Sequence, residues 1–274
     1  MQPIRTILHP TDFSDAGVGA FVHALRVALA ARARLCILHV AATSDDDIMA
    51  FPPVRETLAH WGLMQPGEPR QAIEEKFGVD IAKVDLAPQA PAEGVRAFLA
   101  RHPPDLMVLA TEAREGIARW LHGSIAEKLA RETTAPTLFV PAKARGFVDP
   151  LRGEVHLHHV LIPIDHAPKP AAAVGATMGL VRLLAGIEAE ERLLHVGKSS
   201  PRIARHSDPK RALPVALRQG DVVDAIIETA RDWPADLIGM ATQGHRSVLD
   251  AMRGSTTERV LRQAPCPVLS VPVG

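Results

Sequence analysis

The stretch from Ala241 to Val271, ATQGHRSVLDAMRGSTTERVLRQAPCPVLSV, decides the fold of this chain. It follows the apolar run DLIGMA and holds a loop with Gly244 and Gly254, then a helix start and a last apolar strand. Ser255 precedes Glu258 by three residues, the capping-box pattern of a helix N-terminus. The free N–H groups of such a helix start, beside a glycine loop, suit a phosphate group. The same pattern also occurs at ordinary, well-capped helices.

A second copy of this stretch lies earlier in the chain. Residues Ala110 to Val140, ATEAREGIARWLHGSIAEKLARETTAPTLFV, begin with the same Ala-Thr pair. They carry Gly123 and Ser124, with Glu127 three residues on, at the same distance from the first alanine. An internal repeat of this length indicates two copies of one structural unit.

Apolar runs suited to buried strands alternate with helical periodicity around both copies. In the first half, strands are predicted at residues 4–10, 35–40, 79–86, 105–110 and 137–140. In the second half, they are predicted at residues 159–163, 192–196, 236–241 and 268–271. A helix between the first two strands has an apolar face of Val18, Phe21, Val22, Leu25 and Leu29. The predicted fold class is α/β, with two tandem open doubly wound domains, each a mostly parallel five-stranded sheet with helices on both faces.

Residues 141–154, PAKARGFVDPLRGE, have the proline, glycine and charge content of a linker. We place the first domain at residues 1–145, the linker at 146–154 and the second domain at 155–274. The last strand of each half is apolar and would otherwise be an exposed sheet edge. We therefore expect these two strands to meet, so that the two domains pair about an internal pseudo-two-fold axis. Association of whole chains into a homodimer is left open.

Composition excludes several classes of protein. Lys plus Arg and Asp plus Glu both number 31 in 274 residues, so the formal net charge is zero. A chain without excess positive charge does not attract nucleic acid or an anionic membrane strongly. No apolar signal core and no run of membrane-spanning length is present, so we expect a cytoplasmic protein with no nucleic-acid or membrane partner. Two cysteines, Cys36 and Cys266, do not make a disulfide framework and are expected to be buried and reduced.

Ligands of open α/β sheets bind beyond the carboxyl ends of the strands, at the point where the strand order reverses. The residues to examine therefore follow the first, second and fourth strands of each half. In the first half these are Asp12, Val40 and the loop from Ala110. In the second half they are Asp165, Val196 and the loop from Ala241.

At these positions the chain resembles the universal stress protein family in its tandem two-domain form. The resemblance rests on Pro10-Thr11-Asp12-Phe13-Ser14, Leu38-His39-Val40, Leu194-His195-Val196, and the loop Gly244…Gly254-Ser255 that leads to Ala264-Pro265-Cys266-Pro267-Val268. The family's nucleotide loop has Gly, two residues, Gly, nine residues, then Gly-Ser or Gly-Thr. The second copy lacks only the first glycine, whereas the first copy has alanine at both of the first two positions. Family members without the glycines are similar in fold and hold no nucleotide.

The resemblance implies a stress-response regulatory protein that binds ATP or another adenine nucleotide, with Mg²⁺ as an accompanying ion and no catalytic residue. It assigns contacts with adenosine to Asp12 and Asp165, and backbone contacts with adenine to Val40 and Val196. The expected phosphate cradle is formed by Ala241, Gly244, Gly254, Ser255 and Thr256, with Gly123 and Ser124 at the matching positions of the first half. His245 and Arg246 either add positive charge there or form a solvated surface pair.

The second domain is expected to be the main nucleotide site. In the first half, Ala113 replaces a loop glycine, and Glu112 and Glu115 bring negative charge toward a polyphosphate. A nucleotide-free dimerisation or interaction scaffold of the same fold is the alternative. An enzyme of the wider nucleotide-binding α/β group is a third hypothesis, but the chain lacks a Walker-type lysine after the glycines, so negligible ATP turnover is expected.

The histidines outside these loops give weaker signals. His156, His158 and His159 invite a metal hypothesis, but no cysteine or carboxylate in the sequence pattern completes a ligand set, so no metal is assigned. His39 and His195 lie inside apolar strands and are interpreted as core or rim residues.

Overall fold

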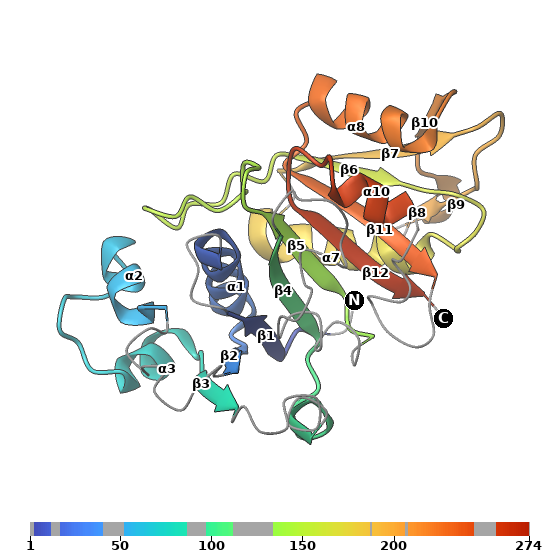
Figure 1. Cartoon of the computed structure of the whole chain (residues 1–274). Helices are drawn as coiled ribbons and strands as arrows, with labels where there is room; N and C mark the ends of the chain where they lie inside the picture. Colours follow the sequence, from blue (N-terminus) through green and yellow to red (C-terminus); the bar gives the residue numbers. More distant parts are fainter. Residues whose placement is uncertain are drawn as a thin grey trace.

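The computed structural model describes residues 3–11, 17–40, 52–86, 97–111, 134–186, 188–205, 208–243 and 256–273. One ten-stranded sheet runs through them in the order β10-β7-β6-β11-β12-β5-β4-β1-β2-β3 (Figure 1). Five parallel strands belong to each half of the chain, and the order within each half is the same. The predicted α/β class is confirmed, and the two sheets are joined edge to edge into one.

The strands of the first half are β1 (Thr6–Pro10), β2 (Arg34–Val40), β3 (Ile81–Leu86), β4 (Leu106–Thr111) and β5 (Thr137–Pro141). Those of the second half are β6 (His159–Pro163), β7 (Glu190–Val196), β10 (Val215–Arg218), β11 (Leu237–Gln243) and β12 (Val268–Val273). A separate antiparallel pair, β8 (Ala204–Arg205) and β9 (Asp208–Ala212), occupies the polar segment after β7. No apolar periodicity in the sequence marks this pair.

The two halves join through antiparallel pairing of β5 and β12. Val268 pairs with Phe139, Leu269 with Leu138, and Ser270 with Thr137. These are the last strands of the two repeats, the ones whose edges would otherwise be exposed. Because equivalent strands meet antiparallel, this junction relates the two halves by a pseudo-two-fold axis.

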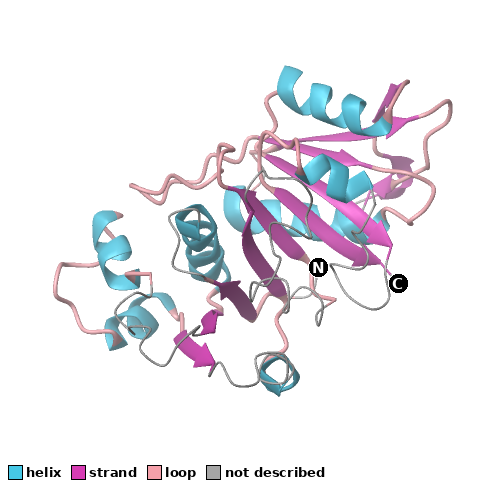
Figure 2. Ribbon diagram, in the orientation of Figure 1, coloured by secondary structure: helices cyan, strands magenta, loops and turns pink. Residues whose placement is uncertain are grey.

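Helices cover both faces of the sheet (Figure 2). The helices α1 (Gly17–Ala31) and α7 (Ala171–Ala185) contact each other and pack on one face, where they share a single apolar core. The helices α8 (Val222–Asp232) and α10 (Thr256–Leu261) pack on the other face with residues 97–101, which are also helical. Two short helices, α2 (Val54–His60) and α3 (Gln71–Phe77), lie between β2 and β3 in the chain.

The predicted inner face of α1 needs one correction. Phe21, Val22 and Leu25 are buried as expected. Val18 is 50% exposed, because it lies in the first turn on the outer side of the helix. The prediction that Val18 belongs to the buried face of α1 is therefore wrong.

In each half, an aspartate just before the fourth strand holds the first strand in register through backbone hydrogen bonds. The carboxylate of Asp105, just before β4, accepts hydrogen bonds from the N–H groups of Arg5 and Thr6 at 2.8 and 2.9 Å. The carboxylate of Asp236, just before β11, accepts hydrogen bonds from the N–H groups of His158 and His159 at 2.8 and 3.0 Å. The repeated Asp-Leu at the start of the fourth strand thus fixes the sheet register in both halves.

The linker is packed against the first half rather than exposed along its length. Phe147 and Val148 are 0% and 3% exposed. Nε2 of His23 in α1 accepts hydrogen bonds from their N–H groups at 3.0 and 3.3 Å, and Nδ1 donates to the carbonyl of Gly19 at 2.7 Å. Burial lowers the pKa of His23 to about 4, so the imidazole is neutral at pH 7.

A tryptophan holds the next part of the linker. Nε1 of Trp61 donates a hydrogen bond to the carbonyl of Pro150 at 3.0 Å. Gly153, at φ +69°, lies directly against the indole ring, where a Cβ atom would overlap it. A short bridge between Val148 and Val155 closes this segment into a turn. The composition of the linker predicts its turns but not its burial.

Cys36 and Cys266 are both free and buried, as expected. Burial raises the pKa of both thiols. None of the helices in the described part of the chain is both long and apolar enough to cross a membrane.

Candidate functional site

A crevice opens in the second half where β6 and β11 separate. These strands pair only at Leu237 with Val160 and at Ile238 with Leu161. Beyond these pairs, β11 continues beside β12, and β6 continues beside β7. The strand order reverses at this point, because β6 leads to α7 on one face while the connection into β11 runs over the other. This is where open α/β sheets bind ligands.

A pocket of about 110 Å³ lies in this crevice. It is lined by Pro163, Ile164, Asp165, Ala167, Pro168, Pro170, Leu194, His195, Val196, Val222, Ile226, Met240, Ala241, Thr256 and Thr257. Small-molecule pockets span about 300–1,000 Å³, so this pocket holds only part of a nucleotide-sized ligand. The loop of residues 244–255, which links β11 to α10, lies outside the described residues.

Asp165 lies at the mouth of the pocket, at the end of β6. Its side chain is 63% exposed, and Oδ1 accepts a hydrogen bond from the N–H of His166 at 2.7 Å. The same oxygen lies 3.8 Å from Nδ1 of the buried His195. Nδ1 of His195 is closer to the carbonyl oxygen of Ile164, at 3.0 Å, and so carries its proton toward that carbonyl. The Asp165 carboxylate therefore remains available to a ligand.

Val196 borders the pocket at the end of β7. On the outer side, Val196 pairs with Arg218 of β10. On the inner side, the ladder with β6 ends at Leu194, whose carbonyl accepts from the N–H of Ile164 at 2.8 Å. Val196 thus lies past the last β6 contact, where its main chain can meet a ligand. In the first half, the N–H of Thr11 donates to the carbonyl of Leu38 at 2.9 Å in the same way.

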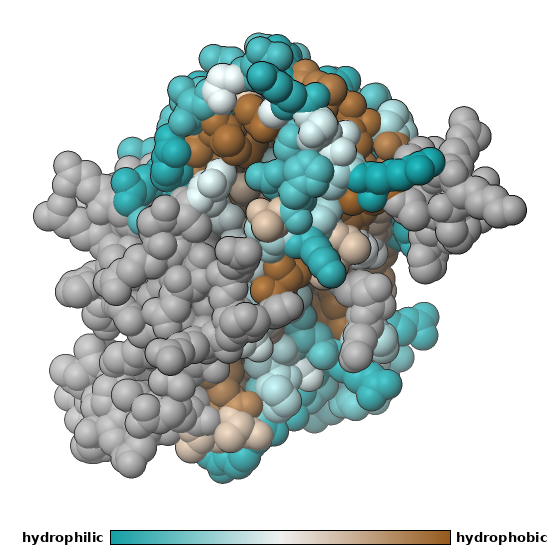
Figure 3. All heavy atoms as spheres, turned by 90° about the vertical axis from the view of Figure 1, so that its right-hand side faces the viewer, coloured by the Kyte–Doolittle hydropathy of each residue, from teal (hydrophilic) through white to brown (hydrophobic). Residues whose placement is uncertain are grey.

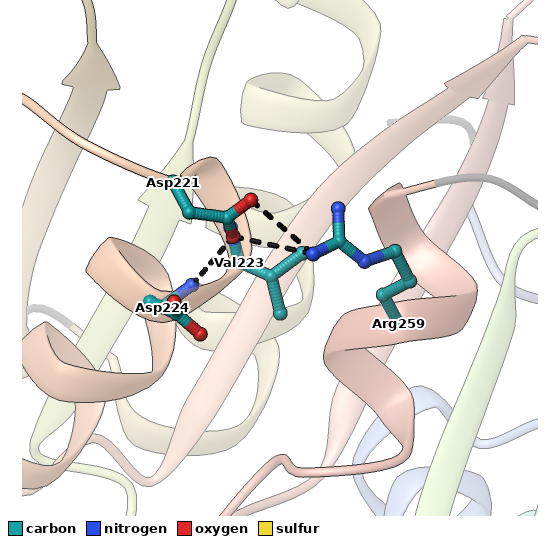
Figure 4. A network of polar contacts seen from close by, with 4 residues as sticks. All are labelled: Asp221, Val223, Asp224 and Arg259. Atoms are coloured by element: carbon teal, nitrogen blue, oxygen red, sulfur yellow. Dashed lines mark hydrogen bonds and ion pairs between the residues drawn. The ribbon is translucent and has the colours of Figure 1, made fainter.

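Two helix ends form the wall opposite the sheet. Asp221 caps α8 by accepting hydrogen bonds from the N–H groups of Val223 and Asp224 at 2.8 and 3.2 Å. Nη2 of Arg259 in α10 donates to both oxygens of the same carboxylate at 3.3 Å (Figure 4). The hydrogen bond from Asp224 and the Arg259 side chain lower the pKa of Asp221. The pair is exposed to solvent, so it adds little to stability, but it links the two helices beside the pocket.

The start of α10 contributes two threonines to the pocket. Thr256 is exposed and Thr257 is 2% exposed. Glu258, the second member of the predicted capping box, is 8% exposed and accepts a hydrogen bond from Nη2 of Arg262 at 2.7 Å. Its predicted partner Ser255 lies outside the described residues.

The surface around this wall carries exposed apolar side chains. Figure 3 faces the second half and shows apolar residues (brown) among polar ones (teal) at the height of α8 and β10. Leu217 of β10 is 53% exposed and Val222 of α8 is 39% exposed. Val222 also lines the pocket, so apolar surface extends from the pocket to the outside.

The structure brings four of the predicted site residues together in this pocket. They are Asp165, Val196, Ala241 and Thr256. Val40 ends β2 in the first half, and its backbone pairs with Leu86 of β3. The remaining predicted residues lie outside the described part of the chain: Asp12, Gly123, Ser124, Gly244, His245, Arg246, Gly254 and Ser255.

Sequence reasoning missed several lining residues. His195 was assigned to the core or rim; it is buried, at 5% exposed, and also lines the pocket. Val222, Ile226 and Met240 carried only a strand or helix signal. These residues line the pocket because α8 packs close to the end of β11. This packing is a tertiary contact that a local sequence pattern does not show.

The histidine-rich segment before β6 is the candidate metal site of the sequence. Nε2 of His156 lies 3.8 Å from Oε2 of Glu154, and the ring centroids of His156 and His158 are 6.4 Å apart. Among the described residues, no three His, Cys, Asp or Glu side chains are placed to share a metal ion.

The strand order and the crevice define a tandem doubly wound α/β protein with a pocket at the switch point. The chain belongs to the universal stress protein family, whose family model matches residues 3–141 and 152–272, once in each half. A universal stress protein of Methanocaldococcus jannaschii is 28% identical over 142 residues, which cover 50% of this chain and 81% of that protein.

Solved structures with the same fold cover the whole chain. A universal stress protein from Archaeoglobus fulgidus DSM 4304 superposes with a TM-score of 0.63 at 17% identity, over 100% of both chains. A functionally unknown protein from Pseudomonas aeruginosa PAO1 superposes with a TM-score of 0.60 at 15% identity, over 99% of this chain and 93% of that one. At these identities the likeness concerns the fold.

Proposed function

We propose that the second half of this chain binds an adenine nucleotide, ATP first, and that the protein acts as a stress-response regulator rather than an enzyme. The observation that carries the proposal is the pocket at the switch point, where apolar walls meet Asp165 at the mouth and the start of α10. Membership of the universal stress protein family supports the same assignment.

The lining has the chemistry that an adenosine group requires. Ile164, Leu194 and Met240 offer apolar surface to a flat base, and the main chain of Val196 can meet its polar edge. The exposed carboxylate of Asp165 can accept hydrogen bonds from ribose hydroxyl groups.

The phosphate groups would extend toward the glycine loop. Ala241 in β11 and Thr256 in α10 both line the pocket, so the residues on either side of that loop border the same cavity. The Thr256 and Thr257 hydroxyl groups can donate to phosphate oxygens. Bound Mg²⁺ would neutralise part of the phosphate charge.

The repeat supplies a matched pair of variants for testing the site. Ala241 in β11 and Ala110 in β4 occupy equivalent places, and both are partly buried against the same core. A leucine at Ala241 fills the pocket, whereas a leucine at Ala110 changes only the first half. We expect ATP to raise the melting temperature of the wild type and of Ala110→Leu but not of Ala241→Leu.

The size of the effect follows from mass action. A ligand that binds only the native state at about 100 times its Kd adds about 2.7 kcal/mol to the free energy of unfolding. GTP at the same concentration should produce a smaller shift, because we propose that the main chain of Val196 pairs with the polar edge of adenine, which differs from that of guanine. An unchanged ATP response in Ala241→Leu would contradict the assignment.

A nucleotide-free interaction scaffold is the second candidate. It is favoured by Ala241 at a position where the family loop has glycine, and by the small volume of the pocket, about 110 Å³. This candidate predicts that ATP, ADP and AMP all leave the melting temperature of the wild type unchanged.

A further inference from the structure

A larger groove opens where the two halves and the linker meet. Its volume is about 580 Å³, within the range of about 300–1,000 Å³ that small-molecule sites occupy. The lining residues are Arg26, Glu154, Val155, His156, Leu157, His158, Leu184, Ala185 and Glu188. They come from α1, from the end of the linker and the segment that joins it to β6, and from the end of α7 with the residues that follow it.

This groove is distinct from the proposed nucleotide pocket. His158 directly precedes β6, and Glu188 shortly precedes β7, so the groove lies at the amino ends of these strands. The nucleotide pocket lies at their carboxyl ends. A ligand in the groove would contact both halves of the molecule, since α1 belongs to the first and α7 to the second.

Arg26 is the unexplained group in this groove. Its Nε atom is buried and has no hydrogen-bond partner, and no ion pair joins Arg26 to any of the described residues. A guanidinium group is always charged and has five N–H donors, so an unpartnered buried nitrogen is costly. Glu154 is directed elsewhere, with Oε2 at 3.8 Å from Nε2 of His156 and 4.0 Å from Nη1 of Arg152.

The other charges of the groove limit what Arg26 can hold. Glu154 and Glu188 would repel a polyanion such as a nucleotide triphosphate. A ligand with one carboxylate can pair with the guanidinium of Arg26, which lines the groove, since a guanidinium and a carboxylate match in geometry. A cationic group on the same ligand would be attracted to the glutamates, and an apolar body would cover the nearby Leu157 and Leu184.

We propose that the groove between α1, the linker and α7 binds a small zwitterion of the amino-acid class, with its carboxylate on Arg26 and its ammonium toward Glu154 and Glu188. This site does not depend on the proposed nucleotide function. Because such a ligand contacts both halves and the linker, it stabilises their junction when it binds.

The test uses the full chain and two probes, L-leucine and the dipeptide leucyl-leucine, which present both charges on bodies of different length. Thermal unfolding is followed as the concentration of each probe is raised. At least one of them should raise the melting temperature in a saturable way. Leucinamide, which lacks the carboxylate, and 4-methylpentanoate, which lacks the ammonium, should bind about tenfold more weakly, the loss expected for one charge-assisted contact.

Variants connect the response to the groove. Arg26→Gln should weaken probe binding about tenfold or more, because it removes the charge that holds the carboxylate. Arg182→Gln is the control, since Arg182 is exposed on α7 and does not line the groove. If Arg26→Gln does not fold, the exposed Glu188→Gln serves instead, with a weaker response to the zwitterions.

Three results would overturn the proposal: no shift with either zwitterion, equal binding of 4-methylpentanoate, or an undiminished response in Arg26→Gln or, if that variant does not fold, in Glu188→Gln.

Discussion

Acid should weaken the attachment of the linker to α1 through a single buried histidine. His23 is 1% exposed, and its Nε2 accepts the N–H groups of Phe147 and Val148. A proton on Nε2 would remove this acceptor and place a charge in the core. The unfolded chain therefore takes up the proton more readily than the folded one.

The magnitude follows from the pKa of His23, which falls from 6.5 to about 4 on folding. At about 1.36 kcal/mol per pKa unit, this difference corresponds to about 3 kcal/mol of stability. Because the folded-state pKa is depressed, the contribution is fully present above pH 6.5. It is lost progressively as the pH falls from 6.5 to 4.

The assay is urea denaturation at a series of pH values from 7 to 4, for the wild type and for His23→Gln. At pH 7 the variant should be less stable by about 1–3 kcal/mol, because two buried N–H groups lose their acceptor. As the pH falls to 4, the difference should shift by about 2–3 kcal/mol in favour of the variant, since only the wild type loses the histidine contribution. His158→Gln is the control, because His158 is exposed. Parallel pH profiles for the wild type and His23→Gln would refute this reasoning.

Three further predictions concern packing, thiol chemistry and turnover. Gly239→Ala in β11 should destabilise the protein by about 1–3 kcal/mol in thermal unfolding, because its Cβ would overlap Thr177 of α7, whereas Gly175→Ala in α7 meets no atom and should be neutral or stabilising. The thiol of Cys266, whose pKa is raised by burial, should react with a disulfide reagent only on unfolding; rapid reaction of the native protein would contradict its burial. Purified protein should release negligible phosphate from ATP, and a steady release abolished by Asp165→Ala would overturn this expectation.

The internal repeat made most of the fold predictable. The two copies of the glycine loop indicate that the chain has two equivalent halves. The Asp-Leu pair that recurs at Asp105 and Asp236 marks the start of the fourth strand in each half. Apolar runs identified most strands, because strands buried on both faces carry few polar residues. The last strand of each half is apolar, and an apolar strand at a sheet edge is expected to pair with another strand. The pairing of β5 with β12 was therefore predictable.

The remaining features depend on contacts between distant segments. Nothing local to Phe147 and Val148 shows that a histidine in α1 will accept their N–H groups, so the burial of the linker was missed. The pocket walls supplied by Val222 and Ile226 depend on the packing of α8 against the sheet. The hairpin of β8 and β9 has no apolar alternation to reveal it.

Titration calorimetry of the full chain with ATP counts the nucleotide sites on the protein. We expect one dominant site per chain, which is lost in Asp165→Ala and retained in Asp12→Ala. Two equal sites per chain would contradict it, as would loss of the tight site in Asp12→Ala but not in Asp165→Ala.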